Sequence, residues 1–147
     1  MRRQRGFGVI AAIAVLVILS SIAGAMVYFS ANQSMAVALD VMSAKAWQAA
    51  RSGNEWGLHA ALKGGWSACS GATNTLDMRA EAGVYVTVTC NSSLYQEGQD
   101  AAGVSKPLRV YEIRAVACPA ASCPAVDASA TGLGYVERSR VVIATSD

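Results

Sequence analysis

Apolar positions change their pattern along this chain, and the first part of the chain is apolar on every side. Residues 7–29 contain no Asp, Glu, Lys, Arg or His. A helix rises about 1.5 Å per residue, so this run would extend about 34 Å, slightly more than the roughly 30 Å of a bilayer's hydrocarbon core. The run therefore predicts one membrane-spanning helix.

The next segment, residues 30–63, keeps a helical pattern but is apolar on one side only. It contains no proline and is rich in residues that favour helix. Apolar or small side chains recur at steps of three and four and predict a stripe facing the core; they are Met35, Leu39, Met42, Ala46, Ala49, Gly53, Trp56 and Ala60. Most polar side chains are expected on the other faces: Asp40, Ser43, Lys45, Gln48, Arg51, Asn54 and Glu55. The glycine pair at 64 and 65 is expected to end the helix.

Beyond residue 64 the pattern changes to the two-residue period of β-strands. Val84–Cys90 alternates strictly, with its valines and the cysteine on one face. Leu108–Cys118 predicts a second strand, with Tyr111, Ile113, Ala115 and Ala117 on the buried face and Glu112 and Arg114 opposite. Gly134–Thr145 predicts a third, whose facing stays open because charged residues interrupt it. The segments 91–106 and 119–132 are expected to be loops.

Together these elements predict an α+β fold. A long N-terminal helix, first transmembrane and then amphipathic, would pack on a small antiparallel sheet and bury one face of each. Two tryptophans of the helix, Trp47 and Trp56, are expected to be packing residues.

The distribution of charge gives the chain an orientation and excludes one class of partner. Three of the twelve basic residues, Arg2, Arg3 and Arg5, precede the apolar run, which leaves nine basic against ten acidic residues after it. The folded part therefore lacks the basic stripe of a nucleic-acid-binding protein. Basic residues before a membrane helix favour a cytoplasmic N-terminus, so the C-terminal part is expected on the outer side of the membrane.

Three interpretations of the N-terminus remain open. A cleaved signal peptide would need a short apolar region before small residues such as Ala23-Gly24-Ala25, but the run continues to Phe29. A plain single-pass anchor is the second. In the third, Arg5-Gly6-Phe7 resembles the type IV prepilin signal. That resemblance implies that a membrane peptidase cuts between Gly6 and Phe7 and methylates the new phenylalanine amine.

Four cysteines, Cys69, Cys90, Cys118 and Cys123, lie in the predicted outer domain. Zinc is one alternative, but structural zinc sites usually pair their cysteines closely twice, and Cys69 and Cys90 are far apart in sequence. An even number of cysteines in an oxidising compartment favours disulfides, for which three pairings exist. Local spacing favours Cys118–Cys123, which leaves Cys69–Cys90.

Several segments together resemble one family. Residues 49–58 resemble a stretch that follows the membrane helix in minor pilins and pseudopilins. The segments Val-Thr-Val-Thr-Cys (86–90), Tyr-Glu-Ile-Arg-Ala-Val-Ala-Cys (111–118) with a later Cys-Pro, and Gly-Tyr-Val-Glu-Arg (134–138) are similar, in that order, to the MshP-type minor pilins of the mannose-sensitive haemagglutinin (MSHA) pilus system. The resemblance covers nearly the whole chain.

The resemblance implies a domain organisation and a set of partners. Residues 1–6 would be the leader, 7–29 the transmembrane helix, 30–63 its amphipathic continuation and 64–147 a periplasmic pilin-like β domain. The chain would be an inner-membrane, single-pass minor pilin that takes part in assembly or initiation of a type IV pilus at its tip, and it could enter the extracellular pilus. Its partners would be other major and minor pilins through the N-terminal helix, the prepilin peptidase and the pilus assembly platform.

One position departs from the pattern of the family's major pilins. Those carry a glutamate five residues into the mature chain, and its carboxylate neutralises the N-terminal amine of the adjoining subunit. In this chain Ala11 occupies that position. Two alternative functions stay open: a membrane-anchored periplasmic binding module and a minor pseudopilin of type II secretion.

No pattern in the sequence points to catalysis, a cofactor or a metal. The single histidine, His59, lies within the predicted helix and is expected to pack or face solvent. The chain has no glycine-rich phosphate loop and no Gly-x-Ser-x-Gly motif. The carboxylates of Asp77 and Glu81 are interpreted as solvated surface. We therefore expect a protein that is not an enzyme.

Overall fold

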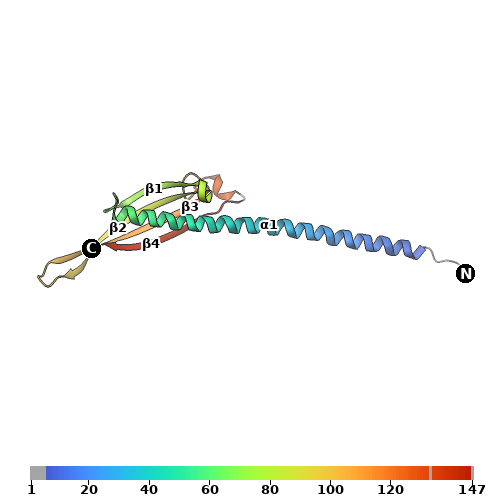
Figure 1. Cartoon of the computed structure of the whole chain (residues 1–147), viewed down its shortest axis with the longest axis horizontal. Helices are drawn as coiled ribbons and strands as arrows, with labels where there is room; N and C mark the ends of the chain where they lie inside the picture. Colours follow the sequence, from blue (N-terminus) through green and yellow to red (C-terminus); the bar gives the residue numbers. More distant parts are fainter. Residues whose placement is uncertain (1–5, 133, 147) are drawn as a thin grey trace. The chain divides into compact units, whose positions relative to one another are not determined.

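The computed structural model describes residues 6–132 and 134–146 and divides the chain into two compact units, Met1–Ala38 and Leu39–Asp147. Along the chain, helix α1 (Gly6–Leu62) is followed by β1 (Ser70–Met78), α2 (Arg79–Ala82), β2 (Val84–Gln99), β3 (Ser105–Cys118), the 3-10 helix η1 (Ala128–Thr131) and β4 (Arg138–Ser146) (Figure 1). Helix α1 contributes residues to both units, and each unit is described separately below.

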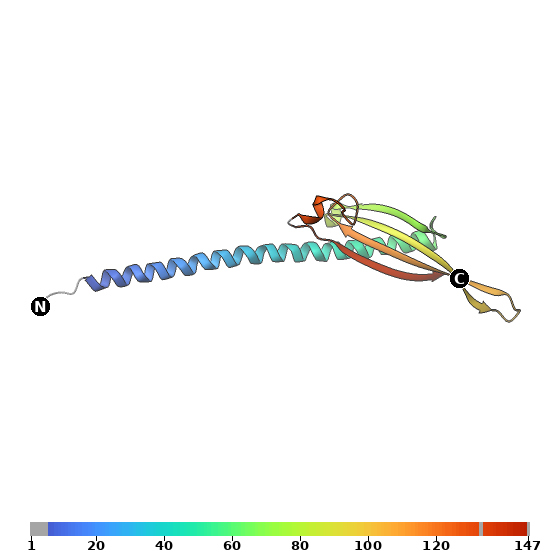
Figure 2. The ribbon, with the colours of Figure 1, turned by 180° about the vertical axis from the view of Figure 1, so that it is seen from behind.

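The second unit is a helix on a sheet. Its strands form one antiparallel sheet in the order β1-β2-β3-β4, so each strand pairs with its neighbour in sequence. The last part of α1, from Leu39, lies along one face of this sheet (Figures 1 and 2). The helix and the antiparallel sheet that the sequence predicts are therefore present.

The two central strands supply the sheet side of the core. The predicted inward faces of β2 and β3 are confirmed: Val84, Val86, Val88 and Cys90 are buried, and so are Tyr111, Ile113, Ala115 and Ala117. The strand register joins these sets, because Val86 lies opposite Ala117 and Val88 opposite Ala115. Cross-strand pairs on one face thus form a continuous apolar layer.

The helix side of the core is made of small residues. Ala46, Ala49, Ala50 and Ala61 are buried, as are Gly53 and Gly57. A Cβ atom at Gly53 would lie 2.6 Å from Cγ1 of Val86, and one at Gly57 would lie 2.6 Å from Cγ2 of Ile113. The helix backbone therefore approaches the sheet more closely than any side chain larger than hydrogen would allow at these two positions.

This geometry corrects the predicted core stripe of the helix. The large side chains assigned to it are exposed at Met35 and Met42, and Trp56 is at least one-third exposed, stacking edge-on against Trp66 with ring centroids 5.1 Å apart. Asn54, expected in solvent, is instead only 5% exposed, beside the buried Gly53. The periodicity located a helix, but the close approach of the backbone selected the face with the smallest side chains.

The sequence analysis missed strand β1. Its outward residues are polar, and its inward residues Ala72, Leu76 and Met78 are only partly buried. Pairing with β2 holds it in place, with Leu76 opposite Val86 and Met78 opposite Val84. An edge strand of this kind is held by its backbone hydrogen bonds to the neighbouring strand. Its apolar and polar residues alternate too weakly for the sequence to predict a strand.

The prediction of a long loop over residues 91–106 was also wrong. β2 continues to Gln99 and β3 begins at Ser105, so the two strands form a hairpin with a short turn. Within the turn, Oδ1 of Asp100 accepts hydrogen bonds from the backbone amides of Ala102 and Val104, both at 2.9 Å. Gly103 has a φ of 79°, which only glycine adopts readily. The outer part of this hairpin is therefore held by backbone pairing between β2 and β3 rather than by buried side chains.

The facing of the third predicted strand, left open by the sequence, is decided in the structure. β4 begins at Arg138, later than the predicted Gly134. Val142 lies opposite Ile113 and packs on the core. Arg140 shares the inner face, and its guanidinium lies 4.7 Å from the ring centre of Trp47. Val141 and Ile143 therefore face away from the helix.

Two disulfides, Cys69–Cys90 and Cys118–Cys123, join the pairs that the sequence spacing favours. The first joins the segment after α1 to β2 in the main core, and the second closes a short loop after β3 in a separate small cluster with Val116. Tyr85 and Tyr135 pack on that second cluster.

Replacing Gly57 with alanine is expected to destabilise this unit. The new methyl group would lie within 2.9 Å of both Ile113 and Val88. Overpacking costs about 1–3 kcal/mol of stability, which outweighs the roughly 1 kcal/mol by which alanine favours a helix over glycine. We expect a lower midpoint of thermal unfolding, followed by tryptophan fluorescence. Ser52→Ala, at an exposed position of the same helix, is the control and should leave the midpoint unchanged or slightly raised; no decrease for Gly57→Ala would contradict the close packing.

Removing the Cys69–Cys90 disulfide is expected to cost more stability than removing Cys118–Cys123. The sequence separations are 21 and 5 residues, and loop entropy assigns about 3 kcal/mol to the longer loop and about 2 kcal/mol to the shorter. Paired cysteine-to-alanine variants, compared by thermal unfolding, measure the difference. Peptide mapping without reduction checks the pairing, and four free thiols or stoichiometric zinc would refute it.

Candidate functional site

The first candidate site is the apolar surface of the N-terminal unit. In the helix of this unit, the described side chains at residues 8–28 and 33–38 are all exposed, including Ile10, Leu16 and Val27. Among the residues that the structure describes, α1 is the helix long and apolar enough to cross a membrane. A helix that is apolar on all sides is stable in lipid or when surrounded by other apolar elements. The helix thus supports single-pass membrane anchoring.

Polar side chains within this apolar stretch satisfy their hydrogen bonds locally. The hydroxyl of Ser20 donates to the carbonyl oxygen of Val17 at 2.9 Å, and that of Ser21 donates to Ile18 at 2.7 Å. Because lipid offers no hydrogen-bonding partners, such internal bonds let serine lie in a membrane helix at little cost.

The predicted cleavage site lies at the beginning of this helix. α1 begins at Gly6, so Gly6 and Phe7 both have helical backbone. The basic leader with Arg2, Arg3 and Arg5 lies outside the described residues. Cleavage between Gly6 and Phe7 stays a prediction.

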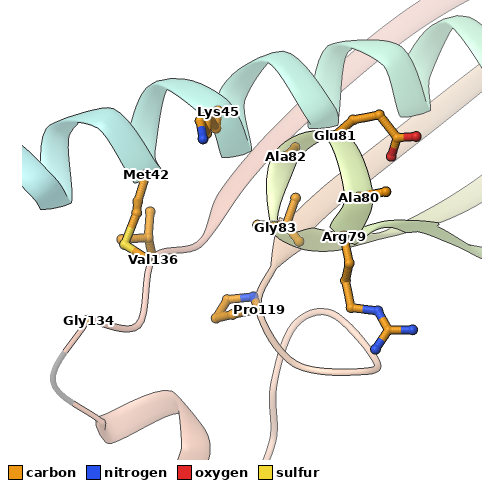
Figure 3. Close-up of a pocket in the computed structure, with 11 residues that line it drawn as sticks. Met42, Lys45, Arg79, Ala80, Glu81, Ala82, Gly83, Pro119, Gly134 and Val136 are labelled. Carbon is orange, nitrogen blue, oxygen red and sulfur yellow. The ribbon is translucent and has the colours of Figure 1, made fainter.

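The second candidate site is a pocket of about 260 Å³ in the Leu39–Asp147 unit (Figure 3). Met42 and Lys45 come from α1, the segment Arg79–Val84 supplies one wall, and Pro119, Gly134 and Val136 come from the chain after β3. Met42 points from the helix toward Val136, whereas the side chain of Arg79 points away from the helix (Figure 3). The pocket is therefore mainly apolar, with charged groups around it.

The arginine at this pocket, Arg79, is already paired with a carboxylate. Arg79 donates from Nε to Oδ1 of Asp77 at 2.9 Å and from Nη2 to Oδ2 at 2.7 Å, and its guanidinium lies 4.8 Å from the ring centre of Tyr85. These hydrogen bonds lower the pKa of Asp77 to about 2. Arg79 is thus a partner of Asp77 rather than a free cation for an anionic ligand, and Lys45 and Glu81 add one charge of each sign to the lining.

The sequence analysis did not find this pocket. Asp77 and Glu81, which the sequence analysis interprets as solvated surface, are both exposed. Asp77 lies near the end of β1, and Glu81 lies on α2. A local signal in the sequence was Gly83, because glycine commonly ends a helix. In the structure Gly83 has a φ of 75° and ends α2. Nothing in the sequence indicates that the chain after β3 returns to this place.

The loop after β3 carries a small polar network of its own. The hydroxyl of Tyr135 donates to Oε2 of Glu137 at 2.5 Å and accepts from the backbone amide of Ala125 at 3.3 Å. Partial burial and the Glu137 contact raise the pKa of Tyr135. The backbone amide of Cys123 donates to the hydroxyl of Thr87 at 2.9 Å. The Cys123–Thr87 bond attaches the loop to the outer face of the sheet, and the two bonds of Tyr135 join parts of the loop to each other.

Within residues 6–132 and 134–146, no three His, Cys, Asp or Glu side chains come together in a way that could hold a metal ion. His59 is exposed on α1. All four cysteines are bonded in disulfides.

Comparisons of the chain with the models of protein families, with curated proteins and with solved structures find no match in any of the three.

Proposed function

We propose that the chain is a minor pilin-like subunit that takes part in the assembly or initiation of a type IV pilus of the MSHA type. The observation that carries the proposal is an apolar, exposed helix that continues directly into a helix packed on a disulfide-linked sheet. A basic segment precedes the helix, as in the prepilin signal.

The N-terminal helix suits a subunit that moves from a membrane into a filament. In the membrane, lipid covers its apolar side chains; in a filament, the helices of neighbouring pilins would cover them. Small residues allow close approach of like helices, and this helix carries Ala11, Ala12, Ala14, Ala23, Gly24 and Ala25. Apart from the helix's own backbone and the neighbouring residues, no described atom lies within 4 Å of a Cβ placed at Gly8 or Gly24, so these positions are open to a partner.

Cleavage after Gly6 would serve this transfer. It removes the three arginines that hold the N-terminus in the cytoplasm but leaves the whole apolar helix attached. The product stays in the inner membrane until the assembly platform extracts it, with the β domain in the periplasm.

The mature chain is expected to begin at Phe7 with a methylated amine. Intact-mass analysis of the protein from cells with and without prepilin peptidase measures this directly. Gly6→Leu should abolish cutting, because the peptidase site needs a small residue there, whereas Gly8→Ala, on the other side of the bond, should be processed normally. A retained Met1 or a mature start near Ala25 would contradict the proposal and favour an anchor or a signal peptide.

The residue at position 11 suggests a place in the pilus. Phe7 to Ala12 contains no acidic residue, so this subunit offers no carboxylate to the N-terminal amine of a neighbour. A buried charge without a partner costs several kcal/mol. The subunit therefore suits a position at the tip or in an initiation complex, where no neighbour's amine has to be neutralised.

Few copies per pilus are expected as a result. Quantitative mass spectrometry of sheared pili should find the subunit far below the major pilin, and its deletion should reduce the number of pili. Ala11→Glu should not improve assembly; Ala11→Gln, which has the same shape without the charge, is the matched control. Abundance comparable with the major pilin, or better assembly with the glutamate alone, would contradict the tip position.

A further inference from the structure

We draw no further inference here: the strongest candidate, the edge strand β4 with its exposed Val141 and Ile143, pairs with β3 alone among the described residues, and nothing in the structure shows what covers its other side.

Discussion

The close approach of α1 to the sheet is the contact on which the folded unit depends. Gly53 and Gly57 bring the helix backbone against Val86, Val88 and Ile113, and alanines cover the rest of the shared surface. Small residues on the helix leave the core to be filled by the valine and isoleucine side chains of the central strands. The buried helix face is therefore narrow, and larger helix side chains such as Trp47 and Trp56 lie at its borders, where they stack against Arg140 and Trp66.

Several charged residues in this unit hold neighbouring elements together. Asp77, Arg79 and Tyr85 join the end of β1, the short helix α2 and β2. Arg138 and Arg140 join β4 to α1 through Ser43 and Trp47. The pocket beside Met42 is lined mainly by apolar residues, with Lys45, Arg79 and Glu81 among them. Among the described residues, exposed apolar side chains lie on the N-terminal helix and, in β4, at Val141 and Ile143.

Exposed apolar surfaces are typical of sites that contact a membrane or another protein. A membrane helix with no internal partner needs lipid or other helices around it, and an exposed apolar edge strand is able to pair with another strand. Both features expose groups that an isolated soluble domain would cover. In the function proposed above, other subunits would cover exposed apolar surfaces of this kind.

The sequence by itself determined the elements whose signal is local. The uncharged run over residues 7–29 and the strict alternation of Val84–Cys90 depend only on neighbouring residues, and the candidate cleavage site at Gly6 and Phe7 comes from the sequence alone. The tertiary structure decided what depends on distant partners. β1 and the long hairpin arm are polar and exist through the backbone ladder, the buried face of α1 follows from how near the helix can approach the sheet, and the facing of Val141 and Ile143 follows from the β3–β4 register. Periodicity shows that a face exists, but only packing shows which residues fill it.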